Sequence, residues 1–157
     1  MESRLKKVQD IVDAAIAQSA DPRKHCVHAC GVSSLSALLA QKRGISAELA
    51  SVAGLLHDIS AVKSGGYDNH CVLGAETASE ILGGTGLFTV EETAIISRAI
   101  LYHDGREDTN GPYDEVLKDA DCAAPYLCDV TKPVSPTAEA RVRKVLAELG
   151  VVNRNLV

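Results

Sequence analysis

The chain has 157 residues and a formal net charge of −5 at pH 7; 46% of its residues are hydrophobic and only 3% are aromatic. This length and apolar content suffice to bury one core, so we expect a single domain over residues 1–157. The acidic balance, together with the lack of basic runs interleaved with aromatic residues, argues against a nucleic-acid polymer or a membrane surface as the partner.

Apolar residues recur at helical spacing from end to end and alternating strand patterns are missing, which predicts an all-α fold: a compact bundle of about six to seven helices. The first helix is expected over about residues 2–19. Asp21 and Pro22 then supply an N-cap and a first-turn proline for a second helix, which continues to about residue 43 before Gly44. Ser46 begins a third helix, and we expect the segment from Ser60 to Gly66 to end it.

The second half of the chain predicts four more helices. One extends over about residues 69–82 and ends in the glycine-rich stretch 83–86, and the next begins at Thr89, where Glu92 occupies the capping-box position. Residues 112–127 form another. Residues 136–149 form a last amphipathic helix, which we assign to packing rather than chemistry.

Two potential metal ligands, His57 and Asp58, stand side by side at the end of an apolar helical run. Imidazole and carboxylate together suit a divalent transition metal, and adjacent residues can both reach one ion only where the helix ends or distorts. The pair therefore predicts a metal site at the end of the third helix.

Three other histidines, His28, His70 and His103, lie on apolar helical stripes, whereas His25 does not. One histidine in such a position is most often a hydrogen-bonded core residue. Several from separate helices carry a large desolvation cost unless they meet at a common cation, which favours a metal site. The stripe neighbours are Val32, Leu35 and Leu39 for His28, Leu73, Thr77 and Ile81 for His70, and Ile96, Ala99 and Ile100 for His103.

A carboxylate joins this set further along the chain. Asp121 shares a helical face with Leu117 and Ala124, whereas Lys118 and Asp119 are expected to turn away from that face. A carboxylate on an apolar stripe needs a partner, so we expect Asp121 to meet the inward imidazoles.

The five cysteines are an odd count without a Cys-x-x-Cys pair, which argues against a disulfide framework. Charged residues such as Lys6 and Asp10 interrupt the first apolar pattern, so it predicts neither a cleavable signal peptide nor a membrane span. Together these features predict a cytoplasmic protein. They leave its oligomeric state open.

The order of these motifs resembles the HD domain superfamily of metal-dependent phosphohydrolases. The resemblance covers about residues 23–129, with a helix for packing at about 136–149 beyond it. The strings that carry it are His28-Ala-Cys-Gly-Val32, Gly54-Leu-Leu-His-Asp-Ile59, His70-Cys-Val-Leu-Gly74-Ala-Glu76, Ala99-Ile-Leu-Tyr-His103 and Asp119-Ala-Asp121.

The resemblance implies a metal centre of one or two divalent ions. The implied primary ligands are His28, His57, Asp58 and Asp121, with Asp58 able to bridge two ions. His70 and His103 match the extra ligands of members that hold two metals. Mixed imidazole and carboxylate ligation leaves the ion open among Mn, Fe, Mg, Co, Ni and Zn.

The resemblance further implies hydrolysis of a small, nucleotide-like phosphate mono- or diester by a metal-activated water. We expect catalytic roles for Asp58, His70 and His103, and substrate binding by Lys63, Arg98 and Arg106. Lys63 is expected in a glycine-flanked loop.

The chain also departs from the patterns of two branches of the superfamily. Four residues after the motif histidine, Ala61 replaces the acidic residue of the nucleotidase branch and the lysine of the cyclic-dinucleotide branch, so neither specific activity is indicated. Two alternatives to hydrolysis stay open: an HD-type diiron oxygenase, and a non-catalytic ligand-sensing HD domain.

Overall fold

The structure is a computed structural model that describes residues 3–151, so the rest of the expected domain, residues 1–2 and 152–157, lies outside it. Within the described range the chain forms eight α-helices and no β-strand, which confirms the all-α prediction with one helix more than expected. The helices are α1 (Arg4–Ile16), α2 (Pro22–Lys42), α3 (Ala47–Leu56), α4 (Ile59–Ser64), α5 (His70–Thr85), α6 (Val90–Tyr102), α7 (Pro112–Cys128) and α8 (Glu139–Glu148).

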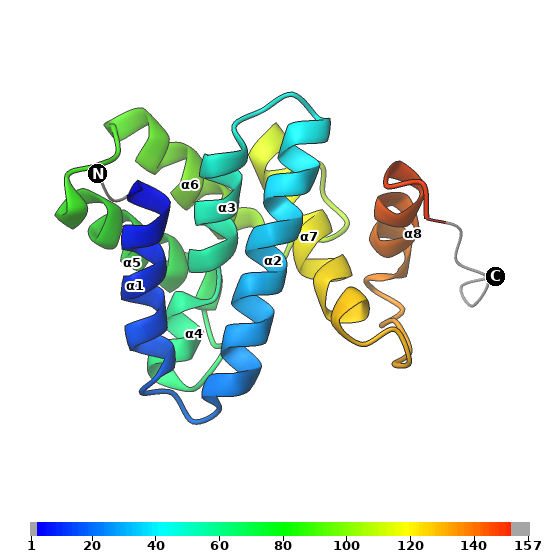
Figure 1. Cartoon of the computed structure of the whole chain (residues 1–157), viewed down its shortest axis with the longest axis horizontal. Helices are drawn as coiled ribbons and strands as arrows, with labels where there is room; N and C mark the ends of the chain where they lie inside the picture. The colour runs from blue at the N-terminus through cyan, green and yellow to red at the C-terminus, as the bar shows by residue number, and fades with distance from the viewer. Residues whose placement is uncertain (1–2, 152–157) are drawn as a thin grey trace.

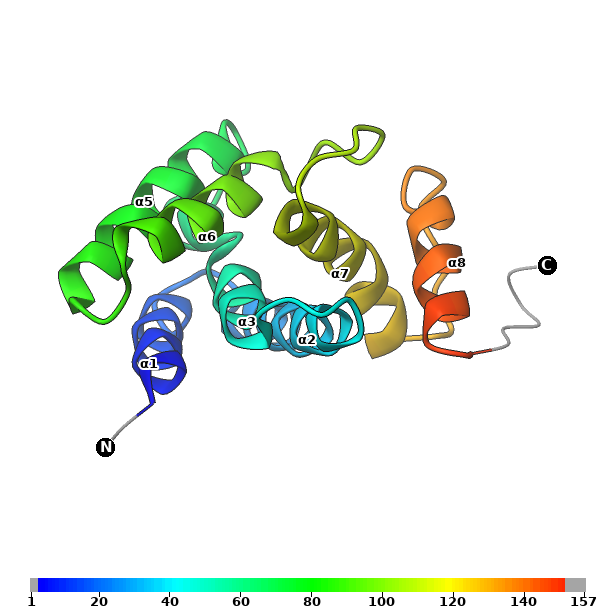
Figure 2. The same ribbon diagram turned by 90° about the horizontal axis from the view of Figure 1, so that it is seen from above.

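Helices α2 and α3 occupy the middle of the bundle (Figures 1 and 2). α3 packs against α2 and α6, and α5 pairs with α6. α7 lies against α2 and α6, and α8 packs on α7 at the opposite end of the molecule from α1 (Figure 1). The core between these helices includes Val32, Leu39, Leu56, Ile96 and Ile100. No helix within residues 3–151 is long and apolar enough to cross a lipid bilayer.

The predicted capping residues begin the helices that carry the histidines. The Asp21 carboxylate accepts a hydrogen bond from the Lys24 backbone N–H at the start of α2, and the Ser46 hydroxyl accepts one from the Leu49 N–H at the start of α3. At the start of α6, Thr89 and Glu92 form the predicted reciprocal capping box. These predicted starts are confirmed.

The break in the helix that carries the His-Asp pair comes earlier than predicted. α3 ends at Leu56, His57 and Asp58 form a turn, and the chain resumes as the short helix α4. The expected end of the helix at Ser60–Gly66 is therefore wrong. α4 itself ends at Ser64, and it is capped by Gly65, whose φ of 76° favours glycine. The backbone of Asp58 has φ −104° and ψ 14°, a region where active-site residues often occur.

The buried face of α5 also differs from the predicted one. Its buried residues are Gly74, Ala78 and Leu82, whereas Leu73 is 45% exposed. The reason is close packing, because a Cβ on Gly74 would lie 3.2 Å from the backbone oxygen of His57. The helix therefore approaches the His-Asp turn through its glycine rather than through a large apolar side chain.

Lys118 and Asp119 were expected to turn away from the core, but both side chains are fully buried. The Lys118 ammonium donates to the Asp108 carbonyl at 2.8 Å. Asp119 pairs with Arg141 at 2.8 Å and with two further cations, one directly after α2 and one on α8. The expectation failed because α8 and the loop before α7 cover this face and bring counter-charges to it.

Gly54 allows α3 to approach α2 closely. A Cβ at this position would lie 2.7 Å from the Cα and 2.8 Å from the backbone nitrogen of Ser33. Because backbone atoms cannot easily move away, we expect Gly54→Ala to lower the free energy of unfolding in urea by about 3 kcal/mol, the upper end of the usual overpacking penalty.

Gly83→Ala is the matched control, because nothing lies within 4 Å of an added Cβ at this position on α5. Alanine favours the helix there, so stability should stay the same or rise by up to about 1 kcal/mol. A Gly54→Ala protein as stable as the wild type would refute the close-packing explanation.

Candidate metal centre

The structure brings the six expected metal ligands together from separate parts of the chain. One lies on α2, two in the turn between α3 and α4, one at the start of α5, one directly after α6 and one on α7. Most of them are near a helix end, where a side chain can leave the packed face of its helix. In chain order they are His28, His57, Asp58, His70, His103 and Asp121.

His28, His57 and Asp121 form a first group of ligand atoms. The Nε2 atoms of His28 and His57 are 3.0 Å apart, and they lie 3.2 and 3.4 Å from Asp121 Oδ1. Tetrahedral ligands at about 2.0–2.1 Å from one ion are roughly 3.3 Å from each other. The three atoms therefore have the spacing of a shared divalent cation.

Asp58 connects this group with a second pair of imidazoles. Its Oδ2 atom lies 3.4 Å from His57 Nε2 and 3.5 Å from His28 Nε2. Its Oδ1 atom lies 3.8 Å from His103 Nε2 and 4.0 Å from His70 Nε2. One carboxylate thus faces two pairs of imidazoles with different oxygens, which is the arrangement that a bridge between two ions requires.

Cys71 is a neighbour of the second pair that the sequence did not indicate. Its Sγ atom lies 3.5 Å from His70 Nε2, and it groups with His70 and His103 as a possible ligand. The one signal in the sequence is its position directly after His70, which by itself is too weak to assign a role.

Backbone carbonyls fix the orientation of three of the imidazoles. His57, His70 and His103 each place Nδ1 within 2.8 Å of the carbonyl oxygen three residues earlier, in Gly54, Tyr67 and Ile100. An Nδ1–H that donates to a carbonyl leaves the Nε2 lone pair free for a metal. In all three residues that Nε2 atom faces Asp58.

The charges of the centre call for a cation. Burial alone would raise the pKa of Asp58, but His57 and His28 hold it well below its usual range. Burial likewise favours a high pKa for Asp121, and His28 and His57 outweigh it in the same way. Both carboxylates are therefore ionised, and a metal ion would balance them.

The carboxylates have the opposite effect on the pKa values of the two nearest imidazoles, His28 and His57, which are raised. Burial lowers the pKa of His57, but the carboxylates of Asp58 and Asp121 outweigh it and raise that pKa well above the ordinary value. The pKa of His28 is raised for the same reason, whereas burial and the neighbouring His57 lower the pKa of His103. The two carboxylates thus favour the protonated form of His28 and of His57.

Metal binding must displace these protons. Because the carboxylates raise the pKa of His28 and of His57, protons compete with the ion for these imidazoles, and we expect the apparent affinity for Mn²⁺ to fall as the pH is lowered from about 7.5 to about 6. Calorimetric titration in two buffers of different ionisation enthalpy should show proton release on binding. Binding that releases no protons anywhere in this range would contradict the assignment of these imidazoles as ligands.

Two pockets adjoin the centre. The larger, of about 640 Å³, opens at His28, and the smaller, of about 240 Å³, reaches Asp121 and Arg106. Pro125 and Lys132 line both pockets, so the two share a wall. A small molecule can therefore approach the ligand cluster from the side of α2 or from the side of α7.

Of the three residues predicted to bind substrate, the structure brings Arg106 to the centre, with Nη2 3.9 Å from Asp121 Oδ2. Arg98 instead pairs with Asp114 at 3.2 Å on the exposed side of α6. Lys63 lies on α4 rather than in a loop, and it lines a separate hollow against Ile11 and other residues of α1. Neither Arg98 nor Lys63 lines the pockets at His28 and Asp121.

Sequence reasoning missed the cations that line the larger pocket, Arg23, Lys24 and Lys132. The position of Lys24 could have been predicted, because it lies four residues before His28 and helical spacing places the two on one face. The position of Lys132 could not, since it follows α7 in a segment without helical periodicity.

The cluster of histidines and aspartates thus lies within an all-α scaffold, with the His-Asp pair at its centre. The family model of the HD domain matches residues 27–126, more than half of the chain. The chain therefore belongs to the HD domain family.

A solved structure agrees with this family. The fold resembles the crystal structure of a predicted HD superfamily hydrolase from an uncultured Thermotogales bacterium, with a TM-score of 0.67. The two chains are 26% identical, and the match covers 93% of this chain and 87% of that one. No protein of curated function shows significant sequence similarity to the chain.

Proposed function

We propose that this protein is a metal-dependent phosphohydrolase that acts on a small phosphate mono- or diester. The observation that carries the proposal is the position of Asp58, whose two oxygens face separate pairs of imidazoles. The pocket that opens beside it at His28 has the volume expected for a small organic ligand.

Each residue of the cluster has a role in this proposal. His28, His57 and Asp121 would hold one ion, His70 and His103 a second, and Asp58 would bridge them. Bound divalent ions supply Lewis-acid charge and lower the pKa of a coordinated water molecule. The Nδ1 atoms of His57, His70 and His103 lie against backbone carbonyls, which supports a role as oriented ligands rather than as proton donors.

Arg106 is the proposed anion-binding residue of the centre. Its Nη1 donates to the Thr137 hydroxyl at 3.0 Å, which holds the guanidinium beside Asp121. Its Nε atom is buried without a hydrogen-bond partner among residues 3–151. The guanidinium lines the smaller pocket next to the ligand cluster, where it suits an oxygen of a phosphoryl group.

The test is hydrolysis of p-nitrophenyl phosphate and bis(p-nitrophenyl) phosphate by Mn²⁺-loaded protein without oxygen. We expect turnover by the wild type, and a loss of at least about a hundredfold in His28→Gln, because losing a ligand costs more than losing a partner of a ligand. His25→Gln is the matched control one turn earlier on α2 and should retain activity.

Other outcomes would overturn the proposal in distinct ways. Oxygen consumption by iron-loaded protein, without hydrolysis of either ester, would assign the chain to the diiron oxygenases. Metal binding without any turnover of a broad phosphoester panel would favour a ligand-sensing domain.

A further inference from the structure

Cationic side chains gather in the pocket at His28, although the chain as a whole carries a net charge of −5. Arg23, Lys24 and Lys132 line this pocket with two carboxylates, Asp21 and Asp129. The Asp21 carboxylate caps α2 by accepting from the Lys24 backbone N–H at 3.1 Å. The lining therefore has an excess of positive charge before any metal ion is added.

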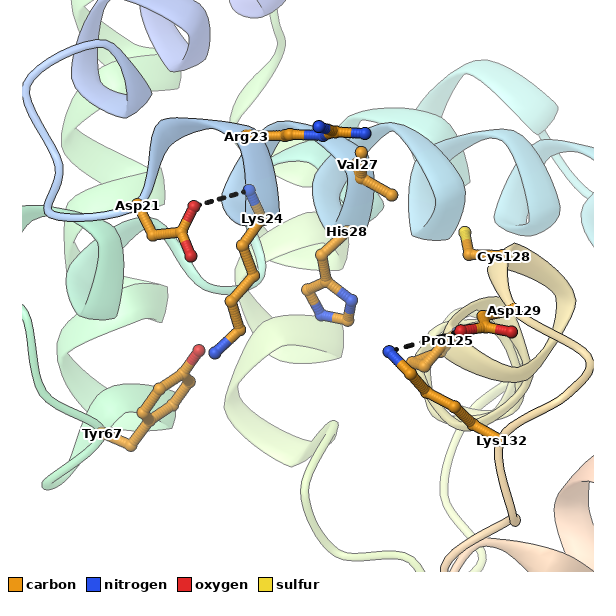
Figure 3. Close-up of a pocket in the computed structure, with 10 residues that line it drawn as sticks. All are labelled: Asp21, Arg23, Lys24, Val27, His28, Tyr67, Pro125, Cys128, Asp129 and Lys132. Atoms are coloured by element: carbon orange, nitrogen blue, oxygen red, sulfur yellow. Dashed lines mark hydrogen bonds and ion pairs between the residues drawn. The ribbon is translucent and has the colours of Figure 1, made fainter.

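The Lys24 ammonium has no ion-pair partner among the described residues of the chain. Lys132 pairs with Asp129 at 3.4 Å, but it is 74% exposed and Asp129 also accepts hydrogen bonds from Thr131. Figure 3 shows Lys24 and Lys132 on opposite sides of the His28 ring, with their side chains extending into the pocket. An anion that enters beside His28 therefore meets a Lys24 ammonium without an ion pair among the described residues, and a Lys132 ammonium held only by an exposed pair.

The wall between the two lysines is largely apolar. Val27, Pro125 and Cys128 line it, and the ring of Tyr67 borders it next to Lys24 (Figure 3). His28 belongs both to this wall and to the ligand cluster, since its Nε2 atom lies 3.2 Å from Asp121. A molecule with one end at the cluster would thus have a short apolar body against this wall and its other end near the lysines.

We propose that Lys24 and Lys132 form a second anion-binding subsite, so that the substrate carries a second anionic group besides the phosphate that is cleaved. The proposal rests on the proposed function. The second group is a phosphate or a carboxylate. A lysine ammonium acts as a point charge and can bind either anion, whereas a guanidinium favours anions that accept two parallel hydrogen bonds. A small ring or a short carbon chain separates the two groups.

A matched pair of esters tests this subsite in the Mn²⁺-loaded protein. Phenyl phosphate and 4-carboxyphenyl phosphate differ by one carboxylate, and release of inorganic phosphate measures both. We expect kcat/KM to be at least about tenfold higher for the carboxylated ester, the usual gain from a hydrogen bond to a charged group. The ratio of the two values should fall towards one in Lys24→Gln and in Lys132→Gln.

Lys42→Gln is the matched control, because Lys42 is exposed at the other end of α2 and should leave the ratio unchanged. The carboxylated ester would be favoured less at high salt, since exposed charges are screened. Equal kcat/KM values for the two esters in the wild type, or a preference that survives both lysine substitutions, would overturn the subsite.

Binding of non-hydrolysable analogues separates this proposal from the proposed function. Calorimetry with phenylphosphonate and 4-carboxyphenylphosphonate needs no turnover. If no ester is hydrolysed but the carboxylated phosphonate binds more tightly in a lysine-dependent way, the subsite stands and the hydrolase function falls. If both esters are hydrolysed equally and both phosphonates bind equally, the function stands and the subsite falls.

Discussion

Asp58→Asn should lose both metal ions, and its rate of phosphoester hydrolysis should fall at least about a hundredfold. A loss of this size exceeds the usual effect of removing a residue that only contacts a metal ligand. Asparagine keeps the size of the side chain but removes the charge that both pairs of imidazoles face. Elemental analysis after reconstitution with Mn²⁺ counts the ions, and the nitrophenyl esters measure the turnover. Asp13→Asn, an exposed carboxylate on α1, is the control that should match the wild type.

A ligand of the second pair provides a sharper contrast. His70 lies 4.0 Å from Asp58 Oδ1, the oxygen on the side of the second ion. His70→Gln should therefore lose the second ion and retain the first, which His28, His57 and Asp121 would hold. Two ions per wild-type chain, one in His70→Gln and none in Asp58→Asn would support a bridged pair. An Asp58→Asn protein that keeps its ions and its turnover would remove Asp58 from the proposed mechanism.

The sequence predicted which side chains meet in the cluster because each proposed ligand leaves a local signal. His28, His57 and His103 interrupt apolar stripes, and an ionisable group in such a place needs a partner wherever the helix packs. The capping residues Asp21 and Thr89 are equally local, since each acts on its own first turn. Signals of this kind do not depend on how the helices are arranged.

Features that depend on the arrangement of the helices were beyond the sequence pattern. Helical spacing predicted that Asp119 turns away from the core, yet it is buried because Arg43 and two cations of α8 surround it. Arg98 lies close to His103 in the sequence and was predicted to bind substrate. It instead forms an ion pair with Asp114 on α7. Periodicity cannot supply such partners, because they come from distant parts of the chain.

The buried Asp119 connects the end helix α8 with the rest of the bundle. Its carboxylate is fully buried and pairs with Arg43 at 2.6 Å and with Arg141 and Lys144 at 2.8 Å. α8 lies beyond the part of the chain that the HD family model matches, and this ion cluster fastens it to α7. Arg141 also donates to the Arg106 carbonyl at 2.8 Å, which links α8 to the anion-binding residue of the centre.

Asp119→Asn should therefore lower the free energy of unfolding by about 3 kcal/mol, since breaking a buried ion pair leaves charges without compensation. We expect the Michaelis constant to rise as well, because Arg141 would lose one of its two carboxylate partners, Asp119 and Glu115, and would hold the backbone of Arg106 less firmly. Glu139→Gln is the control on the same helix: its partner Arg143 is 47% exposed, and such surface pairs contribute at most about 1 kcal/mol. Urea denaturation and steady-state kinetics measure the two effects, and equal stability of both variants would show that Asp119 does not anchor α8.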